Sequence, residues 1–192
     1  MSGIVATTPA SAAHAAAPPL AAAELFAING ARLGMSFRAW QALPRPGPAP
    51  DHIVTDCKPD REGAGRVRAG TPRLECRYVA RYGDYALPVS FPLIGRRRMR
   101  KPVFEFVGGR LAGIRFRTTV DAFNQVMAVL QQGYGPPQRI VRDSVRIEGV
   151  ALPRVRASWR TAGGIVTLTD PSPNPERLEV RLGAASAEPD AG

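Results

Sequence analysis

Apolar and polar residues alternate along several stretches of this chain, which is the pattern of strands with one buried face. The clearest stretch is residues 73–81, where Leu74, Cys76 and Tyr78 fall on one side and mostly charged residues fall on the other. Gly108 and Gly109 separate two further stretches and predict a tight hairpin turn. Strands are predicted over residues 23–28, 52–55, 73–81, 103–107, 110–117, 139–147, 154–161, 165–169 and 177–182.

Two segments have the spacing of amphipathic helices instead. The first begins at Ser36, a favoured N-cap residue, and ends at Pro44. The second begins at a capping box formed by Thr118 and Asp121 and ends in the glycines and prolines of residues 133–137. The apolar residues that define the buried faces are Phe37, Trp40 and Leu43 in the first segment and Val120, Phe123, Met127 and Leu130 in the second.

The order of these elements predicts an α+β fold. Several strands joined by short turns follow each helix, so we expect an antiparallel sheet with two short helices packed on one face. Because helix-then-strands occurs twice, the order is also compatible with two αβ repeats. A chain of 192 residues with 44% hydrophobic content is long enough for one domain. We assign that domain to residues 24–183.

The two ends of the chain have compositions that cannot form a core. Residues 1–23 are almost entirely small residues and proline, and we expect a disordered leader or a residual signal segment. Ala-x-Ala sequences at residues 10–12 and 13–15 have the form of a signal-peptidase cleavage site, although the basic and apolar regions of a signal peptide are missing. Residues 184–192 are expected to be a flexible tail. No apolar run is long enough to cross a bilayer.

The chain has two cysteines, Cys57 and Cys76. We predict a disulfide between them, because it would close a segment rich in glycine and proline and stabilise the fold by about 3 kcal/mol. The alternative is that Cys76 is simply a small buried apolar residue of its strand. A disulfide favours a periplasmic, exported protein over the alternative of a cytoplasmic one.

The charge balance is strongly basic. Lysines and arginines number 26 against 16 acidic residues, for a formal charge of +10, and only Lys58 and Lys101 are lysines. Arginine binds carboxylate and phosphate groups with two parallel hydrogen bonds, so the excess favours an anionic partner. A general bias of composition towards alanine, arginine, glycine and proline would give the same excess without any partner.

Arginines gather in two patterns that could bind such a partner. Many occupy the outward positions of predicted strands, and others form a dense cluster within residues 96–101, which we interpret as a solvated hairpin loop that could alternatively bind phosphate. The aromatic residues fall on the opposite, apolar side of the strands, which disfavours single-stranded nucleic acid. The candidate partner-binding residues are Arg77, Arg115, Arg117, Arg156 and Arg181 on strands and Arg96, Arg97, Arg98, Arg100 and Lys101 in the cluster.

The sequence contains no recognised catalytic motif. There is no P-loop, nucleophile elbow, zinc-protease helix or dinucleotide fingerprint. His52 lies near Cys57 and Asp56, but a cysteine nucleophile and its histidine usually come from distant segments. We therefore expect no catalytic residue, no cofactor and no metal site.

Short motifs resemble those of bacterial envelope proteins. Gly34-Met35-Ser36 at a helix start, the F-x-x-G-R-L-x-x-I hairpin that begins at Phe106, and Tyr134-Gly135 followed by proline are similar to the helix-plus-sheet repeat of BamE/SmpA lipoproteins and of β-lactamase inhibitor protein, and to uncharacterised proteobacterial periplasmic proteins. The chain departs from them in lacking a second Gly-Met-Ser before Val120 and a lipobox cysteine near the N-terminus.

The resemblance implies a scaffold that binds proteins or other envelope components through its sheet, without catalysis. Combined with the arginine pattern, it predicts a non-enzymatic periplasmic interaction module that binds an acidic protein or an anionic envelope component. The alternatives are a basic cytoplasmic protein associated with nucleic acid, which charge alone suggests, and an enzyme of unrecognised type.

Overall fold

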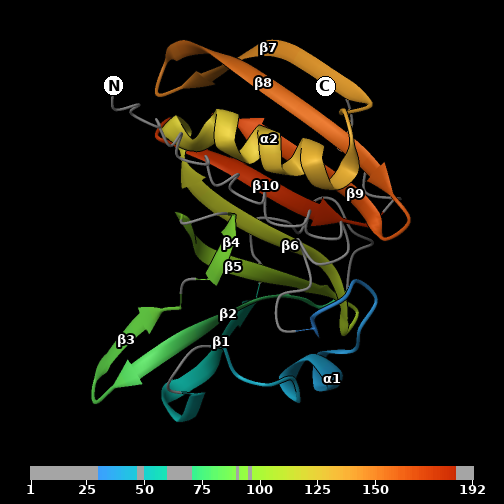
Figure 1. Cartoon of the computed structure of the whole chain (residues 1–192). Helices are drawn as coiled ribbons and strands as arrows, with labels where there is room; N and C mark the ends of the chain where they lie inside the picture. Colours follow the sequence, from blue (N-terminus) through green and yellow to red (C-terminus); the bar gives the residue numbers. More distant parts are fainter. Residues whose placement is uncertain (1–29, 47–49, 60–70, 90, 95–96, 185–192) are drawn as a thin grey trace, which may run out of the picture.

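The computed structural model describes residues 30–46, 50–59, 71–89, 91–94 and 97–184. The predicted leader, the strand expected over residues 23–28, Arg96 and most of the predicted tail lie outside the described residues. Within them the expectation of an α+β fold with an antiparallel sheet is confirmed, although the sheet dominates the structure (Figure 1).

Two helices and ten strands make up the described part of the chain. The helices are α1 (Phe37–Gln41) and α2 (Phe123–Tyr134), with 3₁₀ turns η2 (Pro50–His52) and η4 (Val120–Ala122). The first five strands are β1 (Ile53–Pro59), β2 (Arg73–Tyr82), β3 (Tyr85–Pro88), β4 (Phe91–Ile94) and β5 (Arg97–Val107). The others are β6 (Arg110–Thr119), β7 (Arg139–Ile147), β8 (Val150–Thr161), β9 (Gly164–Asp170) and β10 (Arg177–Gly183).

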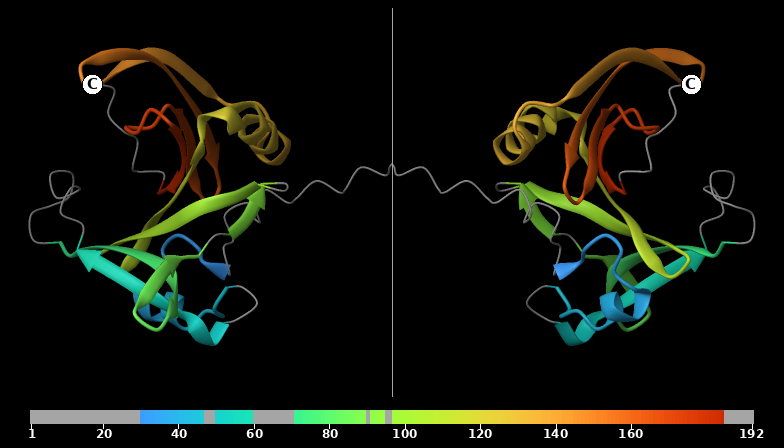
Figure 2. Two further views of the ribbon diagram at one scale, coloured as in Figure 1. Left: turned by 90° about the vertical axis from the view of Figure 1, so that its left-hand side faces the viewer. Right: turned by 90° about the vertical axis from the view of Figure 1, so that its right-hand side faces the viewer.

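The sheet has the strand order β1-β2-β5-β6-β10-β9-β8-β7, and β3 and β4 pair with β2 and β5 off this path. Helix α1 precedes the strands of the first half and α2 those of the second, and the halves meet where β6 pairs with β10. The sheet is strongly curved, and α2 lies against one side of it (Figure 2). Edge strands β1 and β7 therefore lie at opposite ends of the path.

The core lies on the side of the sheet that carries both helices. Fully buried Trp40 of α1 packs against Tyr78, Phe104 and Phe106, with ring centroids 5.0 to 5.2 Å apart. In the other half, the Trp159 indole donates a hydrogen bond to the carbonyl of Gly135, just after α2, over 2.9 Å. The strand registers place Phe104, Ile114, Leu182, Val166 and Trp159 in one continuous row. Both helices thus cover one face.

Local turn chemistry follows the sequence closely at two places. Gly108 and Gly109 have φ values of 56° and 74°, the left-handed conformation that a two-residue hairpin between β5 and β6 requires. Helix α2 ends at Gly135, whose φ of 76° is likewise favourable only for glycine, before the prolines. Ser36 caps α1 by accepting a hydrogen bond from the Ala39 amide, as its position predicts.

Two expectations are wrong. The capping box does not form, because Thr118 pairs with Leu178 and β6 continues to Thr119, so the chain enters α2 through the 3₁₀ turn η4 without a side-chain cap. Residues 97–101 are not a loop, because they form the first part of β5 and pair with β4 and β6. Pairing with neighbouring strands outweighed the weak local preference of this basic stretch for a strand conformation. Strands β3 and β4 were not predicted from the sequence.

The predicted disulfide is confirmed. Cys57 and Cys76 lie directly opposite each other in the β1·β2 ladder, with Cα atoms 4.1 Å apart, and their sulfurs are bonded. Cys76 is fully buried, but the alternative that it is only a small apolar residue of its strand is wrong, because its sulfur is bonded to that of Cys57. The bond ties edge strand β1 to β2. Cys76 belongs to the core cluster that contains Trp40 and Tyr78, and Cys57 packs against that cluster.

Replacing Cys57 by serine should lower the free energy of unfolding by about 3 kcal/mol, because the cross-link then no longer limits the unfolded chain across a sequence separation of 19 residues. Chemical denaturation measures this change. A reductant should lower the stability of the wild-type protein by a similar amount and leave Cys57→Ser unaffected. Equal stability of the reduced and oxidised wild-type proteins would contradict the prediction.

Candidate binding surface

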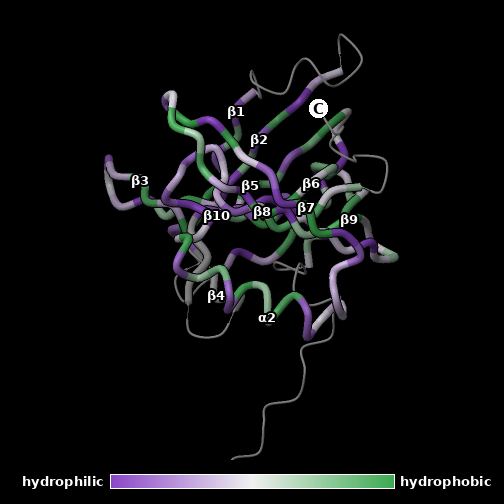
Figure 3. Tube along the Cα trace, turned by 90° about the horizontal axis from the view of Figure 1, so that it is seen from above, coloured by the Kyte–Doolittle hydropathy of each residue, from purple (hydrophilic) through white to green (hydrophobic). Residues whose placement is uncertain are grey.

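The face of the sheet opposite α1 and α2, which we call the helix-free face, carries most of the charged residues of the strands. Hydrophilic and hydrophobic residues alternate along the strands (Figure 3), and the registers align the hydrophilic positions across the sheet. Arginines outnumber carboxylates there. The charged residues placed on this face are Asp56, Lys58, Arg73, Glu75, Arg77, Arg81, Glu105, Arg115, Arg117, Arg139, Asp143, Arg154, Arg156, Arg160, Arg177, Glu179 and Arg181.

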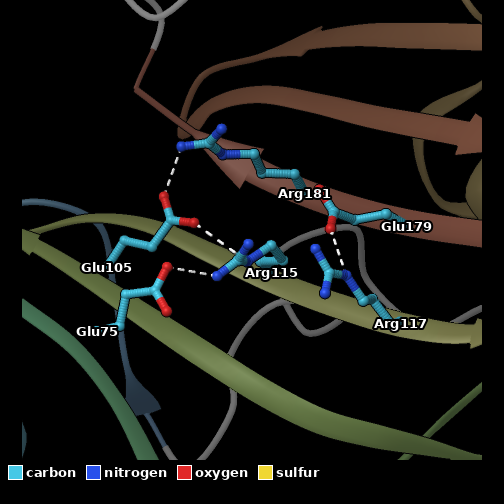
Figure 4. Close-up of polar contacts among 6 residues, drawn as sticks. All are labelled: Glu75, Glu105, Arg115, Arg117, Glu179 and Arg181. Carbon is cyan, nitrogen blue, oxygen red and sulfur yellow. Dashed lines mark hydrogen bonds and ion pairs between the residues drawn. The ribbon is translucent and has the colours of Figure 1, made fainter. Parts of the chain in front are cut away.

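An ion-pair network crosses four neighbouring strands of this face (Figure 4). Glu75 of β2 and Glu105 of β5 are direct cross-strand partners, an arrangement that repels unless a cation lies between them. Arg115 of β6 supplies that cation. Its Nη2 atom lies 2.5 Å from Oε1 of Glu75, and its Nε atom lies 3.3 Å from Oε1 of Glu105.

Glu105 extends the network to the second half of the sheet. Its Oε2 atom accepts a hydrogen bond from Arg181 of β10 over 2.5 Å, while its Oε1 atom faces Arg115. Gly113, directly opposite Glu105 on β6, leaves room for this carboxylate, because a Cβ atom at residue 113 would lie 2.9 Å from Oε2. Only 10% of the Glu105 side chain is exposed, so this carboxylate is the most buried charge of the network. It joins β5 to both strands of the β6·β10 junction.

A second cluster lies at the far end of the face, on β7 and β8. Asp143 accepts two parallel hydrogen bonds from Arg154 and a third from Arg156, each over 2.8 Å. The hydrogen bond from Arg154 is the main reason that the pKa of Asp143 falls to about 2, and the positive charges of both arginines add to it. A single carboxylate thus holds two guanidinium groups side by side. A further pair, Arg117 with Glu179, lies between the two clusters over 2.8 Å.

The structure brings five predicted site residues onto one face, and the register makes Arg100 of β5 the direct cross-strand partner of one of them, Arg117. Arg77, Arg115, Arg117, Arg156 and Arg181 all lie on the helix-free face, as the alternation implies, and all but Arg77 contact a carboxylate in the ion pairs above. The remaining candidates lie on β5 or outside the described residues: Arg97, Arg98, Arg100 and the exposed Lys101 are on β5, and Arg96 is not described.

Sequence reasoning missed the carboxylates of this surface. Glu75, Glu105, Asp143 and Glu179 each occupy an outward strand position, which was the available signal, but their partners depend on strand order. His52 lies apart from this surface, with its ring stacked on Tyr82, and Cys57 is held in the disulfide.

Comparisons with protein-family models, with curated proteins and with solved structures found no match to this chain. Among the described residues, no group of three or more histidine, cysteine, aspartate or glutamate side chains is arranged to hold a metal ion. No helix in the described part of the chain is long and apolar enough to span a membrane. The functional argument therefore rests on the residues of the surface itself.

Glu105→Gln should lower the free energy of unfolding by about 2 kcal/mol, because Arg115 and Arg181 lose the nearly buried charge that they share. Denaturant titration measures the effect. Glu179→Gln is the matched control, because it breaks an ion pair whose arginine is 45% exposed and should cost less than about 1 kcal/mol. Equal costs for the two variants would show that burial of Glu105 has no energetic consequence.

The Asp143 cluster predicts an acid-sensitive contribution to stability. The pKa of this carboxyl is lowered from 3.8 to about 2 in the folded protein, so folding favours the ionised form. The stabilisation is fully present above the unfolded-state value and is lost as the pH falls from about 3.8 towards 2. NMR titration of the side-chain carbon measures the pKa. A midpoint near 3.8, or an unchanged acid-unfolding curve for Asp143→Asn, would contradict this assignment.

Proposed function

We propose that this protein is a non-enzymatic interaction module of the cell envelope whose helix-free face binds an acidic protein. The observation that carries the proposal is the excess of arginines on one sheet face, spread from β2 to β7 across the strand order. Several of the basic side chains on this face are exposed, among them Arg81, Arg117, Arg139 and Arg160. Positive potential of this extent attracts acidic partners and speeds their association.

The ion pairs prepare the arginines for a partner. Asp143 holds Arg154 and Arg156, and Glu105 holds Arg115 and Arg181, in fixed positions. A guanidinium has five N–H donors, so an arginine that hydrogen-bonds one carboxylate keeps donors for a second. Because these arginine side chains are already ordered, binding a partner carboxylate costs less side-chain entropy.

An acidic protein fits the face better than nucleic acid does. The large aromatic residues Tyr78, Phe104, Phe116 and Trp159 are buried on the helix-bearing side, where bases cannot stack on them. The outer part of the β7–β8 hairpin instead adds aliphatic side chains to the helix-free face, beside Asp143 and its arginines. These are Val145 opposite Leu152 and Ile147 opposite Val150, in a segment where β8 pairs only with β7 among the described strands. Apolar residues beside charged ones are typical of protein interfaces.

The fold and the disulfide support the wider proposal. The strand order is symmetric about the β6·β10 pair, with a helix before each half, and we propose that the halves are two αβ repeats. The Cys57–Cys76 bond is compatible with export to the periplasm, where disulfides persist. The two halves would then form one continuous binding face between them, centred on Glu105, Arg115 and Arg181.

A pair of charge-reversal variants with equal net charge tests the binding face. Arg117→Glu with Arg139→Glu changes the helix-free face, and Arg38→Glu with Arg146→Glu changes exposed residues on the helix-bearing side. Poly-glutamate is the model acidic polypeptide, and titration at low salt measures its affinity. We expect the first variant to bind about tenfold more weakly and the control to stay within about threefold of wild type.

Three outcomes would contradict the proposal. Equal losses in both variants would mean that net charge alone attracts the polyanion. No binding of poly-glutamate to the wild-type protein would remove the acidic partner. Much tighter binding of single-stranded DNA than of poly-glutamate, lost in the same variant, would favour the alternative of a nucleic-acid-associated protein.

A further inference from the structure

The β2–β3 hairpin concentrates exposed apolar side chains. Five large apolar residues are exposed among the described residues, and three of them lie on this hairpin: Tyr82 at 54%, Tyr85 at 77% and Leu87 at 58%. The other two, Ile140 and Val150, lie on β7 and β8. Exposed apolar residues scattered singly are normal, whereas a contiguous group marks an interaction site.

The register places the three side chains on one side of the hairpin. Tyr82 is the direct cross-strand partner of Tyr85, and Leu87 is the partner of Ala80 in the next pair on the same face. The ring of His52, from η2, stacks on Tyr82 with centroids 5.6 Å apart. The hairpin projects away from the rest of the described sheet (Figure 1), and its three large apolar side chains stay exposed among the described residues. We call Tyr82, Tyr85 and Leu87 the hairpin tip.

Positive charge accompanies the hairpin tip. Strand β4, which follows β3 almost directly, pairs with the first part of β5, whose sequence is Arg97-Arg98-Met99-Arg100-Lys101. The densest basic stretch of the chain, whose formal charge is +10, therefore lies in the β4·β5 pair. Strand β5 of this pair is also paired with β2 of the hairpin.

We propose that the β2–β3 hairpin binds the surface of an anionic lipid bilayer and inserts Tyr82, Tyr85 and Leu87 among the lipid headgroups. Tyrosine is suited to this position, because its ring enters the apolar layer while its hydroxyl stays hydrated. Basic residues near the surface add electrostatic attraction to anionic lipids, and the apolar side chains add burial. This contact would lie on the helix-bearing side, away from the face proposed to bind an acidic protein.

The size of the patch favours a bilayer over a protein. A specific protein interface buries about 800 Å² on each partner, which is more than three side chains at the end of a two-stranded hairpin provide. Membrane adsorption has no such threshold, because a few inserted side chains and a basic surface act together. The excess positive charge also complements an anionic bilayer directly.

Vesicle binding by the full chain tests the proposal. The probes are vesicles of equal parts phosphatidylglycerol and phosphatidylcholine, compared with pure phosphatidylcholine. Tyr82→Ser with Tyr85→Ser and Leu87→Ser should lower partitioning to the anionic vesicles at least about tenfold. Ile140→Ser with Val150→Ser, the two other exposed apolar residues, is the matched control and should stay within about twofold of wild type. Equal partitioning of the two variants would overturn the proposal.

A second measurement reports directly how deeply the hairpin enters the bilayer. Trp40 and Trp159 are fully buried, so the indole introduced by Tyr85→Trp is the exposed fluorophore of the described part of the chain. Its emission should shift to shorter wavelength with anionic vesicles, and brominated lipids should quench it. Vesicle binding without this shift would show that charge alone attaches the protein, and no binding of the wild-type chain would leave the hairpin tip as a protein contact.

These outcomes are independent of the proposed acidic-protein site. The hairpin variant should keep its affinity for poly-glutamate, because Tyr82, Tyr85 and Leu87 lie on the opposite side of the sheet from Arg117 and Arg139. Arg117→Glu with Arg139→Glu should in turn keep the wavelength shift of the indole introduced by Tyr85→Trp. Loss of both activities in both variants would indicate a single polyanion surface and overturn the assignment of two sites.

Discussion

Trp40→Ala is expected to lower the free energy of unfolding by about 4 kcal/mol, as for other fully buried large side chains. Trp40 connects α1 to β2 and β5 through its contacts with Tyr78, Phe104 and Phe106. Alanine would leave a cavity between rings that strands hold in place, so little collapse can fill it. Denaturant titration followed by circular dichroism measures the change.

The control for this prediction is Trp40→Phe. Phenylalanine retains an aromatic ring in the same cluster and should cost less than about 2 kcal/mol, because the lost volume is smaller. Phe37 of α1, which is only half-buried, offers a second comparison, since its ring contacts Phe106 at the edge of the same cluster. A cost for Trp40→Ala no larger than for Trp40→Phe would show that α1 contributes little to the stability of the sheet.

The alternation of residues predicted much of the sheet and its two faces. Residues 73–81 and 177–182 were expected as strands with arginines on the outer side, and the structure places them in β2 and β10 with that orientation. Period-two alternation identifies a strand and its buried side without reference to any partner strand. The turn at Gly108 and Gly109 and the helix end at Gly135 were predictable for the same reason, because each depends on a local backbone conformation.

Strand order and register were not predictable, and the candidate surface depends on both. Glu75 and Glu105 are 30 positions apart in the chain, and only the β2·β5 ladder makes them direct neighbours that need Arg115. The basic stretch that begins β5 has weak strand preference by itself, and its pairing with β4 determines its conformation. Thr118 satisfies the local pattern of a helix cap, yet its pairing with Leu178 keeps it in β6.

The two proposed contacts use the two sides of the sheet differently. The helix-free face is rich in ion pairs because curvature and strand pairing bring its charged side chains close together, which leaves Glu105 nearly buried. On the helix-bearing side, Tyr82 and Tyr85 are exposed where β2 and β3 extend away from α1 and α2, and Ile140 and Arg146 are exposed on β7.

The β9·β10 pair allows no side chain at residue 164, and Gly164→Ala should lower the free energy of unfolding by at least about 4 kcal/mol. A Cβ atom there would lie 2.2 Å from the carbonyl oxygen of Gly183 and 3.0 Å from a methyl group of Leu33. The oxygen belongs to the backbone and cannot rotate away. Gly164 also has a φ of 141°, which other residues rarely adopt.

Gly163→Ala is the matched control for this prediction, because residue 163 lies in the adjacent turn and its Cβ would meet only the Thr161 hydroxyl, at 3.8 Å. We expect it to cost less than about 1 kcal/mol. Thermal unfolding of both variants compares them directly, and hydrogen exchange of the β9 and β10 amides shows whether their ladder separates first. Similar stabilities for the two variants would mean that β9 can shift along β10 to accept the methyl group. Such a shift would also displace the row of arginines and carboxylates that this register aligns.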